Sequence, residues 1–145
     1  MPWEWLMVNG KLLMVNEVRG VTMMARGQDI EDRLIAFAVR IVMLCDNLPN
    51  SRAGNHFAGQ LLRSGTAPAA HYAEARNAES NRDFIHKMKL GLKEMNESRI
   101  WLRILMEANI MPATRLEELH QECEQLCRIS GASISTVKAK QTTKK

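Results

Sequence analysis

The chain has 145 residues, of which 46% are hydrophobic and 25% charged. This length and balance exclude a disordered segment and indicate one globular domain with its own core. The net charge is +4, but four lysines lie among the last eight residues, so residues 1–137 contain 16 basic and 16 acidic side chains and are neutral overall.

The first 27 residues differ from the rest. They contain five methionines and glycines at positions 10, 20 and 27, and they show no sustained hydrophobic period. We interpret residues 1–27 as an N-terminal extension outside the main fold. This extension is either a loosely ordered hairpin or sequence that lies upstream of a translation start at Met23 or Met24.

Residues 28–137 show helical periodicity, and we expect four helices there. The first helix should begin with Asp29 as its N-cap and end at residues 49–51. Its apolar positions recur at steps of three and four: Ile30, Leu34, Phe37, Ile41, Leu44 and Leu48.

The second predicted helix covers about residues 55–78. After Leu62 it is rich in Ala, Ser and Gly, so its face of small residues should allow a neighbouring helix to approach closely. Pro68 lacks the N–H that would bond to the carbonyl of Ser64, and we expect it to kink or break the helix.

The third helix should start after Ser80 as its N-cap and run for about 27 residues, or some 40 Å. The fourth should begin after Pro112 and continue through Val137. Four helices with short connections place sequential neighbours antiparallel. The predicted fold is therefore all-α, an antiparallel up-and-down four-helix bundle.

Residues 138–145 form a basic tail without acidic side chains. Such an end is typically frayed and improves solubility, and an arm that contacts phosphate groups is the alternative.

The three cysteines all lie in helical patterns, which indicates a reducing cytoplasm rather than a disulfide framework. No apolar run approaches the ~18 residues that a membrane span needs, and the first residues lack the regions of a secretory signal. We expect a cytoplasmic protein without membrane contact.

Several ordered sequence blocks between residues 29 and 130 are together similar to one family. The blocks are Asp29-Ile30, Arg33-Leu34, Phe37-Ala38-Val39-Arg40, Leu48-Pro49, Gln60-Leu61-Leu62-Arg63-Ser64-Gly65-Thr66, Tyr72-Ala73-Glu74-Ala75, Arg82-Asp83-Phe84-Ile85-His86-Lys87, Leu92-Lys93-Glu94, Glu97-Ser98 and Trp101-Leu102. The chain thus resembles the bacterial four-helix-bundle proteins that are encoded by intervening sequences of 23S ribosomal RNA genes.

This resemblance implies a homo-oligomer, a ring of five subunits, with no known catalysis. The related accessory proteins of diversity-generating retroelements look like basic rings that contact nucleic acid and a reverse transcriptase. RNA or DNA is therefore an expected partner, and residues 1–27 have no counterpart in the family.

Two pairs of residues have the spacing of a di-iron motif, namely Glu117 with His120 and Asp83 with His86. Antiparallel packing would place these pairs at opposite ends of the bundle, so we expect no di-iron site. We expect no metal and no cofactor.

His120, Cys123 and Cys127 share one face of the fourth helix, but zinc requires four ligands. Cys123 also continues an apolar stripe, which favours a buried structural thiol. A thiol-linked or zinc-bridged oligomer is the alternative.

A set of charged residues lies among apolar positions of the second and third helices: Arg63, Glu74, Lys93, Glu94 and Glu97. We predict an ion-pair network that sets the register of the two helices, with acid–base chemistry as the alternative. No nucleophile or phosphate-binding loop accompanies these residues, so we do not expect an enzyme.

Basic residues at one end of the bundle are the candidate nucleic-acid contacts. They are Arg76, Arg82, Lys87 and Lys89, together with Lys138 and Lys140 of the tail. Without interleaved aromatic residues the binding should involve the backbone and weaken with salt. An ordinary solvated face is the alternative.

The third helix is apolar on more than one side, because Phe84, Ile100, Trp101, Ile104 and Leu105 exceed one core stripe. The second side should form a subunit interface in a closed ring. We therefore predict a non-enzymatic homo-oligomer that binds nucleic acid or an RNA-processing partner, and a pure protein–protein scaffold is the alternative.

Overall fold

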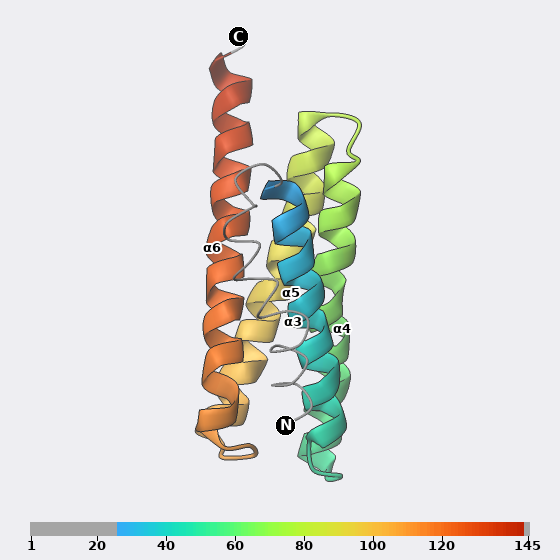
Figure 1. The fold of residues 1–145 in the computed structure, drawn as a ribbon, viewed down its shortest axis with the longest axis vertical. Coiled ribbons are helices and arrows are strands. Elements are labelled where there is room, and N and C mark those ends of the chain that lie inside the picture. The colour runs from blue at the N-terminus through green and yellow to red at the C-terminus, as the bar shows by residue number, and fades with distance from the viewer. Residues whose placement is uncertain (1–25, 144–145) are drawn as a thin grey trace.

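The computed structural model describes residues 26–143, and within this range the chain folds into four helices. They are α3 (Arg26–Asn47), α4 (Arg52–Arg76), α5 (Asn81–Glu107) and α6 (Ala113–Thr143). Consecutive helices are antiparallel and pack side by side (Figure 1). The prediction of an all-α up-and-down four-helix bundle is confirmed.

Serine side chains begin two of the helices. The hydroxyl of Ser80 accepts the backbone N–H of Asp83 at 3.0 Å, as predicted for the third helix. Ser51 caps α4 in the same way through the N–H of Gly54, also at 3.0 Å. The prediction of Asp29 as the N-cap of the first helix is wrong, because α3 begins at Arg26 and Asp29 lies inside its first turn.

Pro68 lies inside α4 and does not break it. A proline in a helix interior removes one hydrogen bond and crowds the preceding turn, which together cost about 3 kcal/mol, and the packing of α4 between α3 and α5 offsets this cost. Across the contact, α5 has Gly91, where an added Cβ would lie 3.8 Å from the carbonyl oxygen of Pro68.

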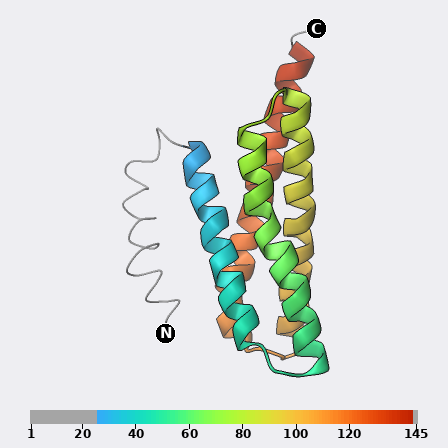
Figure 2. The same ribbon diagram turned by 90° about the vertical axis from the view of Figure 1, so that its right-hand side faces the viewer.

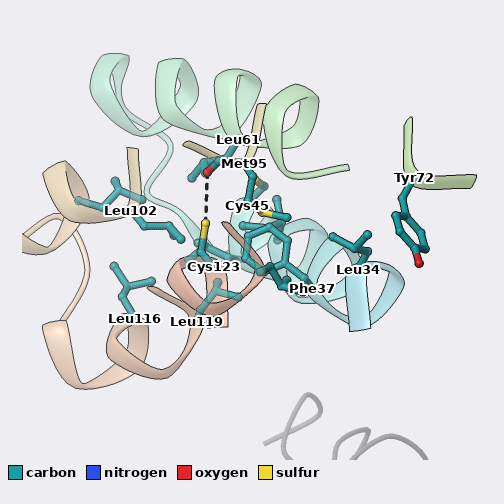
Figure 3. Packing of buried hydrophobic residues seen from close by; sticks show 14 of the residues in the cluster. Leu34, Phe37, Cys45, Leu61, Tyr72, Met95, Leu102, Leu116, Leu119 and Cys123 are labelled. Atoms are coloured by element: carbon teal, nitrogen blue, oxygen red, sulfur yellow. Dashed lines mark hydrogen bonds between the residues drawn. The ribbon is translucent and has the colours of Figure 1, made fainter. Parts of the chain in front are cut away.

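All four helices contribute to one hydrophobic core (Figure 3). Its largest fully buried hydrophobic residues are Phe37, Ile41, Leu61, Met95, Leu102, Leu105, Leu116 and Leu126. The face of small residues on α4 lies inside this packing, as expected. Gly65 packs against Ile41, and the buried hydroxyl of Ser98 donates to that of Ser64 at 2.8 Å.

The contact between α3 and α6 has a different character. α3 packs mainly against α4 and touches α6 only sparingly, so it forms one edge of the bundle (Figure 2). The two helices are joined by polar groups, since the guanidinium of Arg33 donates to Glu122 and to Gln125, the latter at 3.0 Å. Burial lowers the pKa of the neighbouring Arg40, and Glu118 and Glu122 partly offset this effect.

α6 has 31 residues and extends past the ends of its neighbours at its C-terminus (Figure 1). The structure places residues 138–143 of the predicted basic tail in the last turns of this helix. Of the predicted N-terminal extension, residues 26 and 27 belong to α3 and residues 1–25 lie outside the described range, as do residues 144–145.

Candidate nucleic-acid interface

The outward face of α5 has a row of basic side chains. Arg82, His86, Lys89 and Lys93 are all exposed and follow one another at steps of four, three and four. This spacing places them on one side of the helix along about 16 Å. We call these four residues the basic stripe.

Three acidic residues near the stripe, Glu94 and Glu97 of α5 and Glu74 of α4, are paired across the contact between the two helices, whereas Asp83 beside Arg82 belongs to none of these ion pairs. Arg63 of α4 forms ion pairs with Glu94, at 2.7 Å, and with Glu97. Glu74 of α4 pairs with Lys87 at 3.0 Å. The predicted network therefore exists as two separate groups, one around Arg63 and one formed by Glu74 and Lys87.

Lys93 was predicted as a member of that network, and the structure places it in the basic stripe instead. Within residues 26–143, none of the ion pairs involves Arg82, Lys89 or Lys93. The stripe therefore keeps its positive charge, although the whole domain is nearly neutral. From the sequence, Arg82 and Lys89 were grouped as contacts but Lys93 was assigned to the ion-pair network, and the spacing of four, three and four is the signal that could have joined them.

The other candidate contacts differ in whether an acidic residue already pairs with them. Arg76 forms an ion pair with Glu31 of α3, and Lys87 with Glu74 as described above. The hydrogen bond to Glu74 is the main cause of the raised pKa of Lys87, and the charge of the same carboxylate raises it further. Lys138 and Lys140 are exposed near the C-terminus of α6, at the bundle end where α5 begins (Figure 1).

The comparisons with known proteins now identify the family. A family model described as "23S rRNA-intervening sequence protein" matches residues 27–132. The chain belongs to the 23S rRNA-intervening sequence protein family. A crystal structure of a protein of unknown function from the S23 ribosomal protein family of Bacteroides thetaiotaomicron is 33% identical, with a TM-score of 0.68, and the match covers 72% of this chain and 97% of that chain. A comparison with curated proteins gives no match.

This member of the 23S rRNA-intervening sequence family extends beyond the matched region at both ends. Residues 1–26 precede the match, and the last turns of α6, including Lys138 and Lys140, follow it. The basic stripe lies entirely inside the matched region.

The possible metal ligands of this family member are dispersed. The pair of Asp83 and His86 lies at the start of α5, and the pair of Glu117 and His120 lies near the start of α6, at the opposite end of the bundle (Figure 1). The Nδ1 atom of His120 lies 3.1 Å from a carboxylate oxygen of Glu124. Across residues 26–143, no three His, Cys, Asp or Glu side chains are placed to hold a metal ion.

Within residues 26–143, large exposed apolar side chains lie on three helices. One set consists of Ile35, Val39 and Val42 on α3 with Leu62 on α4, and the other consists of Ile100 and Ile104 on α5. The sequence assigned Leu105 to an outer side of the third helix as well, which is wrong because Leu105 is fully buried in the core.

Aromatic rings fill part of the contact between α4 and α5. Trp101 is half-buried there and packs edge-on against Phe57 at 5.8 Å between ring centroids.

None of the helices in the described range is long and apolar enough to span a membrane.

Proposed function

We propose that this protein is a non-enzymatic homo-oligomer that binds the phosphate backbone of RNA or DNA through the outer face of α5. The observation that supports this most directly is the basic stripe, whose lysines and arginine are exposed and form no ion pair with any acidic residue of the part of the chain that the structure describes. An RNA-processing protein with bound nucleic acid would bind the same surface through that nucleic acid.

The chemistry of the stripe favours backbone contacts without base specificity. Three permanent cations on one helix face can neutralise two or three phosphates, which predicts a slope of log K against log salt of about −2 to −3 per subunit. The neighbouring ring of Phe84 is half-buried, so the stripe offers no platform for stacking bases. Several subunits bound to one strand would raise the affinity by avidity.

The apolar sets on the surface support self-association. The set on α3 and α4 lies on other helices than the set on α5, and two different patches suit a head-to-tail contact between copies. Head-to-tail contacts generate closed rings when the rotation between subunits allows it. We therefore include a ring, with five subunits as the expected number, in the proposal.

The test is a fluorescence-anisotropy titration of labelled duplex RNA, duplex DNA and single strands between 50 and 200 mM salt. The variant Lys89→Glu/Lys93→Glu reverses two charges of the stripe. The control Arg103→Glu/Arg115→Glu makes the same charge change at the other end of the bundle, where both arginines are exposed.

We expect the stripe variant to bind at least about tenfold more weakly and to lose about two units of salt slope. The control should bind nearly as the unchanged protein does. Equal weakening in the two variants, or no binding by the unchanged protein at low salt, would sink the nucleic-acid proposal.

A protein–protein scaffold is the second candidate, and the exposed apolar sets favour it. Light scattering on the same samples separates the two functions, with Val39→Glu as the variant that disrupts the apolar set on α3. An oligomer that requires Val39 and shows no binding of nucleic acid would leave the scaffold as the function. A monomer at all concentrations would remove the oligomer from the proposal.

A further inference from the structure

Two thiols lie one helical turn apart on α6, away from the basic stripe. Cys123 is fully buried, and its Sγ atom donates to the carbonyl oxygen of Met95 at 3.3 Å (Figure 3). Cys127 follows four residues later and is half-buried, so only this thiol of the pair is within reach of a small molecule. The two side chains are close enough for each thiol to shift the pKa of the other.

The surroundings divide the roles of the two sulfur atoms. The neighbouring Cys123 thiol lowers the pKa of Cys127, and the charges of Arg99 and Arg128 act in the same direction, while burial and Glu124 oppose them. The interaction with Cys127, together with burial, raises the pKa of Cys123. Cys127 is therefore the more acidic and more accessible thiol of the pair, and Cys123 is the buried one that keeps its proton.

The third cysteine provides an internal comparison. Cys45 is buried, its Sγ atom lies 3.4 Å from the carbonyl oxygen of Ala58, and burial raises its pKa to about 11. A buried thiol of this kind without a thiol partner is chemically inert.

We infer that Cys127 and Cys123 form a peroxide-reactive dithiol site, in which Cys127 is the attacking sulfur and Cys123 the resolving one. The Cys127 thiolate attacks one oxygen of hydrogen peroxide, the O–O bond breaks, and hydroxide leaves as the sulfur becomes a sulfenic acid. The Cys123 thiol then attacks that sulfur, and the OH group leaves with the thiol proton as water. In total, two thiols and one peroxide give one disulfide and two waters.

The geometry permits this bond at a structural cost. Residues four apart in an ideal helix have Cα atoms about 6.2 Å apart, inside the range of disulfides, but their Cβ atoms are about 1–2 Å too far from each other. Closing the bond tightens this turn of α6 and takes Cys123 away from the carbonyl of Met95. The disulfide should therefore be easily reduced, as strained disulfides are.

The test uses the reduced full-length protein, treated with hydrogen peroxide at neutral pH, alkylated, and analysed by intact mass and peptide mapping. We expect a loss of two hydrogens within one chain, with Cys123 and Cys127 joined and Cys45 still alkylated. Cys45→Ala is the matched control and should behave as the unchanged protein does. Cys123→Ala should stop at a sulfenic acid on Cys127, which a cyclic 1,3-diketone traps.

Alkylation rates give a second readout that does not depend on any variant. The pKa of Cys45 lies about two units above that of an ordinary thiol, which lowers its thiolate fraction about 100-fold at neutral pH. A more acidic thiol is also a weaker nucleophile, so the expected difference in alkylation rate is roughly tenfold. Cys127 should therefore react at least about ten times faster than Cys45 at neutral pH. Equal rates for the two cysteines, or disulfides only between chains, would overturn the inference.

Discussion

Replacing Gly65 by alanine tests how tightly α3 and α4 are packed. A Cβ atom at Gly65 would lie 2.7 Å from the Cγ1 and Cγ2 atoms of Ile41 and 3.1 Å from its Cβ atom. Ile41 is 0% exposed, so its side chain has no free space to move into. Either Ile41 leaves its rotamer or the two helices separate.

The magnitude follows from two opposing effects. Forcing an extra methyl group into a packed core costs about 1–3 kcal/mol, whereas alanine gains about 1 kcal/mol over glycine inside a helix. Gly59 lies on the same helix and is exposed, and a Cβ atom there would meet nothing within 4 Å. Gly59→Ala therefore has the gain without the clash, and the two variants should differ by about 1–3 kcal/mol.

The assay is urea unfolding followed by circular dichroism, with the unchanged protein and the two variants at one protein concentration. A fixed concentration is needed because self-association would shift the apparent stability. We expect Gly59→Ala to be the most stable of the three and Gly65→Ala to be the least stable or close to the unchanged protein. If Gly65→Ala stabilised as much as Gly59→Ala, the close contact with Ile41 would be refuted.

Three further predictions concern single positions. Ser98→Ala removes the donor of the buried hydrogen bond to Ser64 and should cost about 1–2 kcal/mol in urea unfolding, while the double variant Ser64→Ala/Ser98→Ala should cost less than the sum of the single changes. Asn109 has a φ of 54°, so Asn109→Gly should leave the melting temperature nearly unchanged, whereas Asn109→Val should cost about 1–2 kcal/mol. Because the pKa of Cys45 is raised in the fold, the folded state keeps a proton that the unfolded state loses, and stability should fall between about pH 9 and pH 11. Cys45→Ala should flatten that fall in denaturation series across pH, and an unchanged slope would contradict the raised pKa.

Much of the fold could be predicted because helix periodicity is a local property. The stripe of Phe37 and Ile41 and the cap at Ser80 depend only on residues a few positions apart. The errors occurred where one residue suits two roles. Ser51 was interpreted as the end of one helix, although it caps the next one, and the acid at Asp29 suits a first turn as well as an N-cap.

The consequence of Pro68 could not be predicted from its own segment. Its local effect is to weaken a helix, but whether the helix breaks depends on how much packing its neighbours supply. Residues far away in the sequence, such as Gly91, decide how closely those neighbours approach.

By itself, the sequence determined which residues form helices and which of them share a face, because both follow from spacing along one chain. Only the tertiary structure decided which charges are neutralised. Lys87 pairs with Glu74 while Lys93 stays exposed, although the two lysines are six residues apart on one helix. The difference arises because an ion pair requires a partner on the neighbouring helix. The orientation of α4 relative to α5 brings Arg63 and Glu74 of α4 to one side of α5 only.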